Sequence, residues 1–529
     1  MAEETEGFKV AKKIGIGSIA NFISVGIGKV FTLLFYLLIF WALSKEDAGL
    51  FFIALSFMGV ISMSFNFGVP AIMQRYTAFF EGQGKHGKLK DLFLKGIVFT
   101  VVSAFVVSFF LYLFRETIVN FYGNVHLLEL MGLVVLGSFF TIVYPYFIQF
   151  LLGRQRFIRY ASINSVYPFS RIIFALIFIF VLFDSTVVSM LLAHTMSLAF
   201  AFLLSMILCI YDFFKFIYPN KRQSLTFLEI KEMIFYGVPV YVTSISSTIT
   251  SHADTLCIGY FMPEEAVASY NSVLTIARNA GYIVSTIFSN IMGSTLSYYY
   301  GKGNMDMFKK ITENSLKWYL FFGLPVLLVV LVYPFEIMKY FFNDYADSYW
   351  LFYILGPTFF MMVLSTSHKT ALSAGGKTKV FTYVTLAMII PNLILNIILI
   401  PHLGLLGAAI ATMFSFISSK SLFIYYSKKY FGIWFPKDIH KVLLSGGIML
   451  FCLILIHQFV DIELVTASIF DTMSFDIPVR IISIFVLGLI VGSVFLIYTA
   501  SFFIQKPFTD VEKRLLNKYI LQNFSFLID

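Results

Sequence analysis

Long apolar stretches, separated by short polar ones, fill almost the whole chain. We draw fourteen such segments, and each reaches or approaches the roughly 20 residues that a membrane-spanning α-helix needs. The pattern predicts an all-α polytopic membrane protein with about 14 transmembrane helices. The segments are residues 14 to 43, 48 to 72, 96 to 114, 126 to 152, 160 to 183, 186 to 211, 234 to 262, 267 to 298, 318 to 335, 349 to 368, 380 to 401, 404 to 426, 441 to 460 and 479 to 504.

The composition agrees with this pattern. The 529 residues are 59% hydrophobic and 13% charged, whereas soluble domains carry about 25% charged residues. The two longest loops, 212 to 233 and 461 to 478, are too short to fold as separate domains, which excludes a soluble catalytic domain. Three cysteines without paired spacing indicate neither a disulfide framework nor a metal site.

Basic residues are distributed very unevenly between the two sides of the predicted bundle. When charges near segment ends are assigned to the nearer face, three of the 38 Lys and Arg residues remain in the membrane. With the N-terminus on the cytoplasmic side, only Lys45, Arg115, Lys339 and Arg480 fall outside. The other basic residues are cytoplasmic, so we expect a multi-pass protein of the cell membrane with both termini in the cytoplasm. The net charge of +9 then reflects topology and does not indicate nucleic-acid binding.

An internal repeat divides the chain. The turn Gly153 to Arg156 matches Gly376 to Lys379 at an offset of 223, and the same offset relates the tyrosines and prolines downstream of each turn. Because six segments separate the copies, the halves should be parallel repeats with the site between them. Chance similarity of two basic loops is the alternative. We predict a six-helix lobe over 1–211, a linker over 212–233, a second six-helix lobe over 234–430, and two additional helices with a cytoplasmic tail over 431–529.

The segment from 267 to 298 carries a row of polar residues on one helical face. Their spacing alternates between four and three, which stacks them along one side of an α-helix. A guanidinium at mid-depth costs roughly 2.5 to 3.5 kcal/mol on insertion scales, so Arg278 should face protein or water. We interpret this face as one wall of a polar, cationic cavity. The row is Asn271, Thr275, Arg278, Tyr282, Ser285 and Ser289.

Three more charges lie within apolar segments, namely Lys29, Arg171 and Asp254. Intramembrane charges mark functional sites by default. Each also has a structural interpretation: Arg278 and Asp254 can form an ion pair, Arg171 can face its own lobe, and Asp254 can serve only as a hydrogen-bonding group. Three buried cations and one buried anion leave a positive potential that attracts an anionic ligand. We expect this ligand to carry a phosphate or pyrophosphate group. We therefore assign substrate binding to Lys29, Arg278, Arg171, Asn271 and Tyr282, and ion coupling or gating to Asp254.

No motif indicates catalysis or a cofactor. Gly375 to Thr378 looks like the end of a phosphate-binding loop, but Ala371 replaces the required glycine and no strand precedes it. Hydrolase motifs and paired metal-ligand spacings are missing from the sequence. We expect no enzyme activity, no cofactor and no metal.

Several stretches resemble the polysaccharide flippases of the Wzx type, within the superfamily that also holds multidrug extruders and lipid II flippases. They are Leu43 to Leu50, Asp254 to Phe261 with Tyr270, the two basic turns, and Pro401 to Ala409. The resemblance implies a two-lobed bundle that opens alternately to each side and moves a lipid-linked glycan outward. It also implies a cavity lined chiefly by segments 1, 2, 7 and 8, which carry Lys29, Asp254 and Arg278.

We therefore predict a monomeric flippase for a prenyl pyrophosphate-linked oligosaccharide, whose partners are that substrate, membrane lipid and a coupling proton or sodium ion. A cation-coupled multidrug extruder is one alternative and predicts an acidic cavity. A membrane-embedded polymerase or glycosyltransferase is another and predicts a large outer loop or a carboxylate cluster. A passive scramblase is the third, and headgroup selectivity separates it from a flippase.

Overall fold

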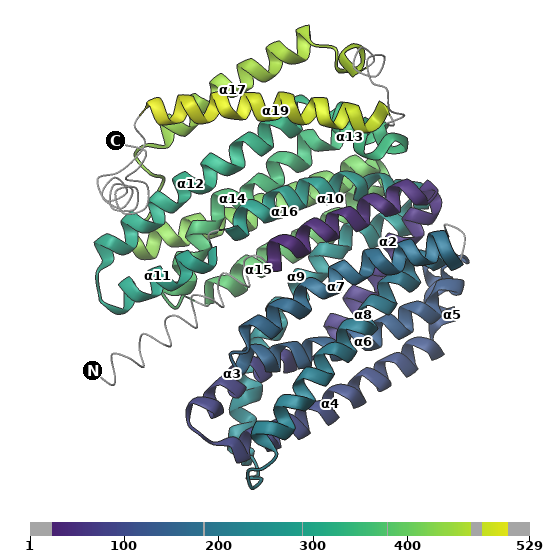
Figure 1. The fold of residues 1–529 in the computed structure, drawn as a ribbon, viewed down its shortest axis with the longest axis vertical. Coiled ribbons are helices and arrows are strands. Elements are labelled where there is room, and N and C mark those ends of the chain that lie inside the picture. The colour runs from purple at the N-terminus through teal and green to yellow at the C-terminus, as the bar shows by residue number, and fades with distance from the viewer. Residues whose placement is uncertain (1–23, 183–185, 288, 378, 467–478, 506–529) are drawn as a thin grey trace.

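The computed structural model describes residues 24–182, 186–287, 289–377, 379–466 and 479–505, and every regular element in these residues is a helix (Figure 1). The helices are Ser24–Ala42, α2 (Lys45–Ser64), α3 (Val69–Gly82), α4 (His86–Leu113), α5 (Arg115–Tyr122), α6 (Leu127–Gly153), α7 (Phe157–Ile177), α8 (Val187–Asp212), α9 (Phe227–Phe261), α10 (Glu264–Ile287), α11 (Ser289–Gly301), α12 (Met305–Val332), α13 (Pro334–Phe342), α14 (Phe352–Ala374), α15 (Lys379–Leu403), α16 (Leu405–Phe431), α17 (Ile439–Phe459) and α19 (Val479–Ile504). Short π-helical turns, Phe178–Leu182 and Phe213–Ile217, follow α7 and α8, and a 3₁₀ segment, Asn343–Leu351, precedes α14. The predicted all-α polytopic fold is confirmed.

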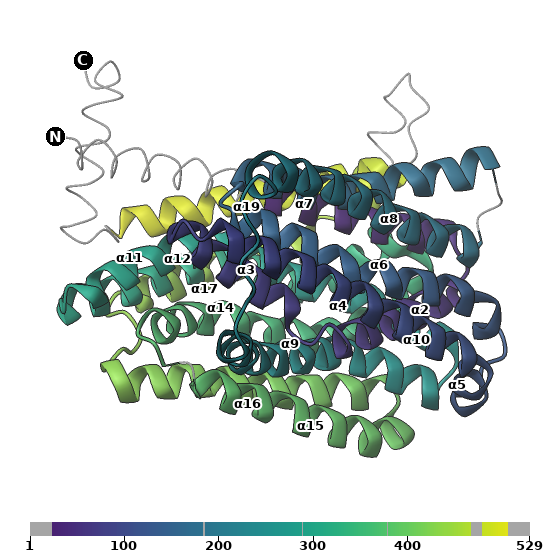
Figure 2. The ribbon, with the colours of Figure 1, turned by 90° about the horizontal axis from the view of Figure 1, so that it is seen from below.

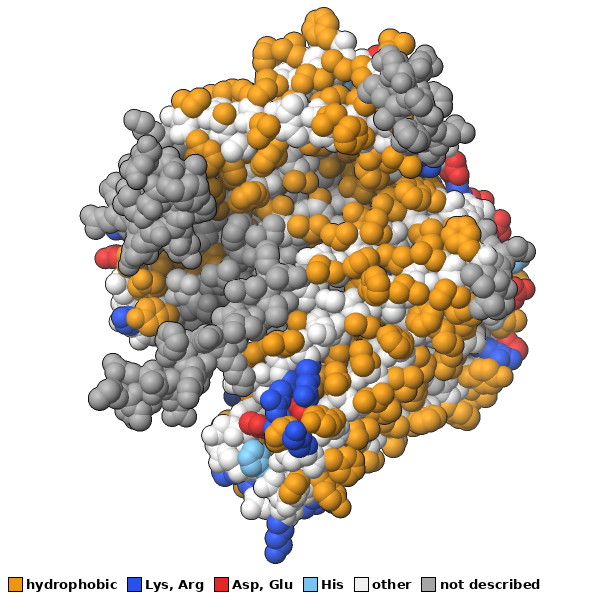
Figure 3. Space-filling view, in the orientation of Figure 1, with side chains coloured by type: hydrophobic (Ala, Val, Ile, Leu, Met, Phe, Trp, Pro, Cys, Tyr) orange, Lys and Arg blue, Asp and Glu red, His pale blue; other side chains and the backbone are white. Residues whose placement is uncertain are grey.

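Thirteen helical stretches among the described residues are long and apolar enough to cross a membrane. Large apolar side chains stay exposed on them, such as Phe105 and Phe109 on α4 at 63% each. Hydrophobic side chains cover most of the visible face, and charged ones gather toward the ends of the bundle (Figure 3). A lipid environment accounts for this surface, because a soluble protein rarely exposes so large an apolar area.

The order of helices repeats between the halves of the chain. The helix 24–42, α2 with α3, and α4 to α8 correspond in turn to α9, α10 with α11, and α12 to α16. The two groups lie side by side in Figures 1 and 2, and α17 and α19 pack on each other beside α12 at one edge. This order fits the predicted pair of parallel lobes; the lobe boundaries at 211, 233 and 430 stay a prediction.

The second predicted segment, 48 to 72, is wrong as a single helix. The chain leaves the helix after Ser64 and re-enters it at Val69, with Phe67 and Gly68 in the left-handed region at φ of 50° and 72°. The amide of Gly68 donates to Asn66 Oδ1 at 3.0 Å. A Cβ on Gly68 would lie 2.7 Å from the carbonyl oxygen of Gly237, so glycine allows both the turn and this close approach. An apolar pattern alone does not reveal such a break.

One end of the bundle, which we call the basic end, holds a network of ion pairs. Asp212 at the end of α8 is fully buried and pairs with Arg156 at 3.1 Å and Arg159 at 2.5 Å. Arg154 is 5% exposed and binds both carboxylate oxygens of Glu81, at 2.8 and 3.1 Å. The first basic turn therefore ties α3, α6, α7 and α8 together at this end.

We expect Asp212→Asn to lower the thermal unfolding temperature of the purified protein. Its carboxylate accepts two charge-assisted hydrogen bonds, and weakening them should cost roughly 2 kcal/mol because the arginines are one-third exposed and recover hydration. Glu232→Gln is the matched control, since Glu232 is exposed on α9. Equal unfolding temperatures for the two variants would contradict a stabilising role for this network.

Candidate functional sites

Lys29 lies at the contact between the two halves of the chain. It belongs to the helix 24–42, and its Nζ stands 4.0 Å from the centre of the Tyr282 ring on α10. Both side chains are partly exposed, which fits an amine that is available to a ligand. The ring face attracts the ammonium group, yet such a contact contributes only about 0.5 to 2 kcal/mol and leaves the positive charge uncompensated.

Arg278 is half-buried four residues before Tyr282 on the same helix. Its Nη1 donates to the backbone carbonyl of Ser251 on α9 at 3.4 Å. Within the described part of the chain, no carboxylate lies within 4.0 Å of its guanidinium. The predicted alternative of an ion pair with Asp254 is therefore not what the structure shows. The positive charges of Arg278 and Arg171 both act on Lys29.

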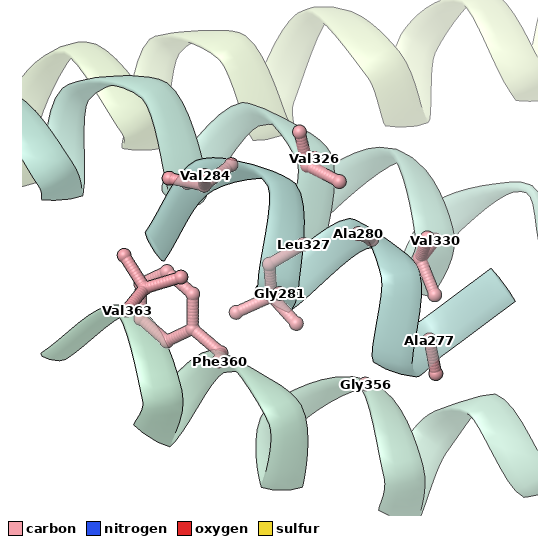
Figure 4. A pocket seen from close by; sticks show the side chains of 11 residues that line it. Ala277, Ala280, Gly281, Val284, Val326, Leu327, Val330, Gly356, Phe360 and Val363 are labelled. Carbon is pink, nitrogen blue, oxygen red and sulfur yellow. The ribbon is translucent and has the colours of Figure 1, made fainter. Parts of the chain in front are cut away.

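The opposite face of α10 is apolar and fixes the helix in place (Figure 4). Ala277, Gly281 and Val284 line a cavity of about 20 Å³ against α12 and α14. A Cβ on Gly281 would lie 2.7 Å from the carbonyl oxygen of Phe359, so this glycine lets the two helices approach closely. The cavity is too small and too apolar for a ligand. It anchors the helix whose other side carries Arg278 and Tyr282.

Arg171 on α7 is only 3% exposed and sits among aromatic rings of the first half of the chain. Its guanidinium carbon lies 4.3 Å from the Phe35 ring centre and 5.5 Å from the centres of Tyr36 and Tyr167. Its Nε and Nη2 atoms are buried without a hydrogen-bond partner. The structure therefore places Arg171 inside its own lobe, as the structural interpretation expected, but with unused donors and no compensating carboxylate among the described residues.

The residues of the polar row on α10 differ in exposure and do not form one continuous surface. Asn271 is 5% exposed, donates to the carbonyl of Val267 at 2.9 Å and accepts from Thr255 at 3.2 Å. Ser285 is also buried and donates to the carbonyl of Gly281 at 2.7 Å. Tyr282 is 38% exposed. The assignment of Asn271 to a binding site stays a prediction, and its amide is already engaged between α9 and α10.

Asp254 occupies a buried polar site in the second half of the chain. It is 4% exposed and accepts hydrogen bonds from side chains on three other helices. One oxygen accepts from Asn392 at 3.0 Å and Asn396 at 2.8 Å on α15, and the other accepts from Tyr270 on α10 at 3.0 Å and from Thr412 on α16. All four donors are neutral. Among the residues that the structure describes, no cation pairs with this carboxylate, and low-dielectric surroundings make an unpaired ionised carboxylate costly.

The amide oxygens beside Asp254 complete an unusual set of groups. Oδ1 of Asn392 and Oδ1 of Asn396 are both buried and have no hydrogen-bond partner. Together with the carboxylate and the Thr412 hydroxyl they offer several oxygen ligands, the type that hard cations such as sodium prefer. The described residues contain no group of three or more His, Cys, Asp or Glu side chains that could hold a metal ion.

Three of these residues, Asn392, Asn396 and Thr412, were not identified from the sequence. Asn392 and Asn396 lie four residues apart in an otherwise apolar segment, so they share a helical face. That spacing is the signal that points to them. Lys420 on α16 was also missed, because it stands near a segment end. It is half-buried, and its Nζ lies 5.1 Å from the Phe416 ring centre.

Family models match most of the chain. Residues 14–292, more than half of the protein, match the family described as polysaccharide biosynthesis protein. Residues 239–398 match the MatE family. The two matches overlap in α9 to α11, the region that holds Asp254 and Arg278.

Curated relatives are similar at low identity. An uncharacterized membrane protein of Methanocaldococcus jannaschii is 24% identical over 411 residues, covering 74% of this chain and 77% of the relative. The probable low-salt glycan biosynthesis flippase Agl15 of Haloferax volcanii is 24% identical over 215 residues, or 40% of this chain and 44% of the relative. A putative O-antigen transporter of Shigella flexneri is 26% identical over 183 residues, or 34% and 43%. The chain thus matches less than half of the length of these last two relatives.

Solved structures share the fold. The lipid II flippase MurJ in an inward closed conformation superposes with a TM-score of 0.65 at 18% identity, covering 93% of this chain and 99% of that one. An inward-facing multidrug resistance MATE family transporter of the MOP superfamily gives 0.64 at 14% identity, covering 78% and 98%. At these identities the likeness concerns the fold alone.

Proposed function

Because the chain belongs to the polysaccharide biosynthesis protein family and has the fold of MOP superfamily transporters, we propose that it moves a lipid-linked oligosaccharide from the cytoplasmic to the outer leaflet. The observation that carries this proposal is the group of Lys29, Arg278 and Arg171, which has no carboxylate partner among the described residues. Such a group of cations favours an anionic ligand, and the diphosphate of a prenyl-linked glycan carries the required negative charge.

In this proposal the basic side chains lower the cost of taking the headgroup through the membrane. Lys29 and Arg278 bind the diphosphate from opposite lobes, while the prenyl tail stays in lipid. Arg171 lies behind Lys29 and adds positive potential through its unused donors. Because Lys29 and Tyr282 join the two lobes, a phosphate that draws the ammonium group away from the ring weakens this contact. Ligand binding is thereby linked to the movement of one lobe relative to the other.

The end opposite the basic end is closed by contacts between the lobes. Trp41 Nε1 donates to the carbonyl of Phe341 at 2.5 Å, and the Tyr122 hydroxyl donates to the carbonyl of Leu256 at 2.9 Å. Gly49 packs so closely on the backbone of Glu264 that a Cβ would overlap it. With the basic end placed in the cytoplasm by the positive-inside rule, we assign this arrangement to the state that is closed to the outside. Both termini of this cell-membrane protein are then cytoplasmic.

Asp254 with its oxygen-rich surroundings is proposed as the coupling site. In this proposal a sodium ion takes the carboxylate and the amide oxygens of Asn392 and Asn396 as ligands, or a proton neutralises the carboxylate. Either event removes the cost of a buried unpaired charge. Because the donors come from α10, α15 and α16, binding changes how these helices pack on α9. The protein is proposed to act as a monomer, without a cofactor or enzymatic step.

Reconstitution into liposomes tests the proposed function. A fluorescent polyprenyl diphosphate-linked oligosaccharide is placed in both leaflets, and a membrane-impermeant quencher reports the fraction that remains inaccessible. We expect the purified protein to increase transfer of this lipid well above that of ethidium, a cationic dye. Transport of ethidium without transfer of the glycolipid would favour the multidrug extruder, elongation of the glycan would favour a polymerase, and equal transfer of all lipids would favour a scramblase.

A further inference from the structure

An apolar groove of about 480 Å³ runs between α3, α4 and α9. It lies where α3 and α4 of the first lobe meet the basic-end half of α9. Its wall is almost entirely hydrocarbon and aromatic, and three of its side chains are about half exposed: Phe99 at 48%, Ile234 at 53% and Val238 at 48%. The groove is therefore open at the protein surface and is not part of the packed core.

The break between α2 and α3 contributes Phe67 to the wall of this groove. Phe67 lies in the left-handed turn. The centre of its ring is 5.9 Å from the ring centre of Phe99 and 6.1 Å from that of Tyr241. The Tyr241 hydroxyl donates to the carbonyl of Ser64, the last residue of α2. The turn thus positions the aromatic rings of Phe67 and Tyr241 against the groove.

The other end of the groove carries positive charge. Lys95 lines it and pairs with buried Asp91 at 2.7 Å, while Arg222 pairs with the same carboxylate at 2.6 Å. Lys90 bonds the carbonyl oxygen of Tyr218 at 2.8 Å. The side chains of Lys95 and Arg222 are 44% and 52% exposed. The single carboxylate of Asp91 therefore faces two cations, Lys95 and Arg222, and this pair leaves a net positive charge at the rim of the groove.

We propose that the groove holds the prenyl tail of the lipid-linked substrate in the inner leaflet, with the diphosphate against Lys95 and Arg222. This inference deepens the proposed function and rests on it. The apolar wall suits a single hydrocarbon chain, and the cationic rim complements a phosphate group at the membrane surface. The helix α9 runs from the apolar part of the groove to the central cluster, because Val242 in the groove is nine residues, or about 14 Å, from Ser251, which Arg278 contacts. The groove is the loading position from which the headgroup passes to Arg278.

Site-specific photocrosslinking tests this proposal. The photoreactive residue p-benzoylphenylalanine is placed at Val238, or at Ile390 on α15 as a control. Each position is eleven residues from the basic-end start of its helix, and the two side chains are 48% and 51% exposed. The probe is tritiated polyprenyl diphosphate in phosphatidylcholine vesicles. We expect about tenfold more label at Val238 than at Ile390, and most of this excess should disappear in K95A/R222A.

The outcomes separate tail binding from ordinary lipid contact and from the proposed function. Equal labelling at the two positions, or competition by phosphatidylglycerol as effective as by unlabelled polyprenyl diphosphate, would overturn the proposal, because ordinary membrane lipid would then occupy the groove. Arg278→Ala should leave the label at Val238 unchanged while slowing translocation. Strong label at Val238 in a protein that translocates no glycolipid would uphold the groove and reject the proposed function.

Discussion

Replacing Arg278 by alanine should slow translocation of the lipid-linked oligosaccharide about a hundredfold, because two charge-assisted hydrogen bonds to phosphate together supply about 3 kcal/mol. Among the described residues the guanidinium donates one hydrogen bond, to the carbonyl of Ser251 at 3.4 Å, which leaves its other donors for a ligand. The substitution also removes an uncompensated charge from a membrane-spanning helix, which should leave the fold intact. Initial rates in the liposome quenching assay measure the effect.

The controls for Arg278 separate charge from geometry. Arg278→Lys keeps the positive charge but loses the bidentate donor pair, so it should transport at a rate between those of Arg278→Ala and the wild type. Lys302→Ala removes an exposed cation at the end of α11 and should transport normally. Thermal unfolding of all three variants verifies that they are folded. A wild-type rate for Arg278→Ala would remove the central residue from the proposed mechanism.

The membrane-spanning fold was predictable because lipid enforces a simple rule. Each segment must be apolar and long enough to cross hydrocarbon with its backbone bonded internally, and both properties are visible in a sequence. The uneven distribution of basic residues predicts which end of the bundle is cytoplasmic, and this orientation stays a prediction. The break at Phe67 and Gly68 was not predictable, because a left-handed turn of two residues leaves the hydrophobic pattern unchanged.

The sequence indicated which charged residues lie within the apolar segments, but not which residues they contact. A charge within an apolar segment must be buried in protein or water, and this argument identified Lys29, Arg278, Arg171 and Asp254. Helical periodicity gives the face of one helix, whereas the neighbour that meets that face depends on packing between segments far apart in the chain. Asp254 therefore meets Asn392 instead of Arg278, and Asn271 turns away into a contact with α9.

Asp254→Asn should abolish the dependence of transport on a cation gradient. Asp254 supplies the only carboxylate among the five described side chains that form the site, and a neutral amide can neither bind sodium tightly nor take up a proton. We expect gradient-driven accumulation of the substrate in the outer leaflet to fall at least about a hundredfold, which corresponds to losing an electrostatic interaction of about 3 kcal/mol. Equilibrium exchange between leaflets should persist, because Lys29 and Arg278 remain in place.

Gradients of sodium and of protons, imposed separately, identify the ion. If sodium is coupled, Asn392→Ala and Asn396→Ala should raise the sodium concentration needed for half-maximal rate, since each removes an amide oxygen that has no other partner. If a proton is coupled, the same variants should instead shift the pH at which the rate is half-maximal. Ser247→Ala is the control, because Ser247 is an exposed polar residue on α9 away from this site. An Asp254→Asn protein that still responds to either gradient would place the coupling elsewhere in the chain.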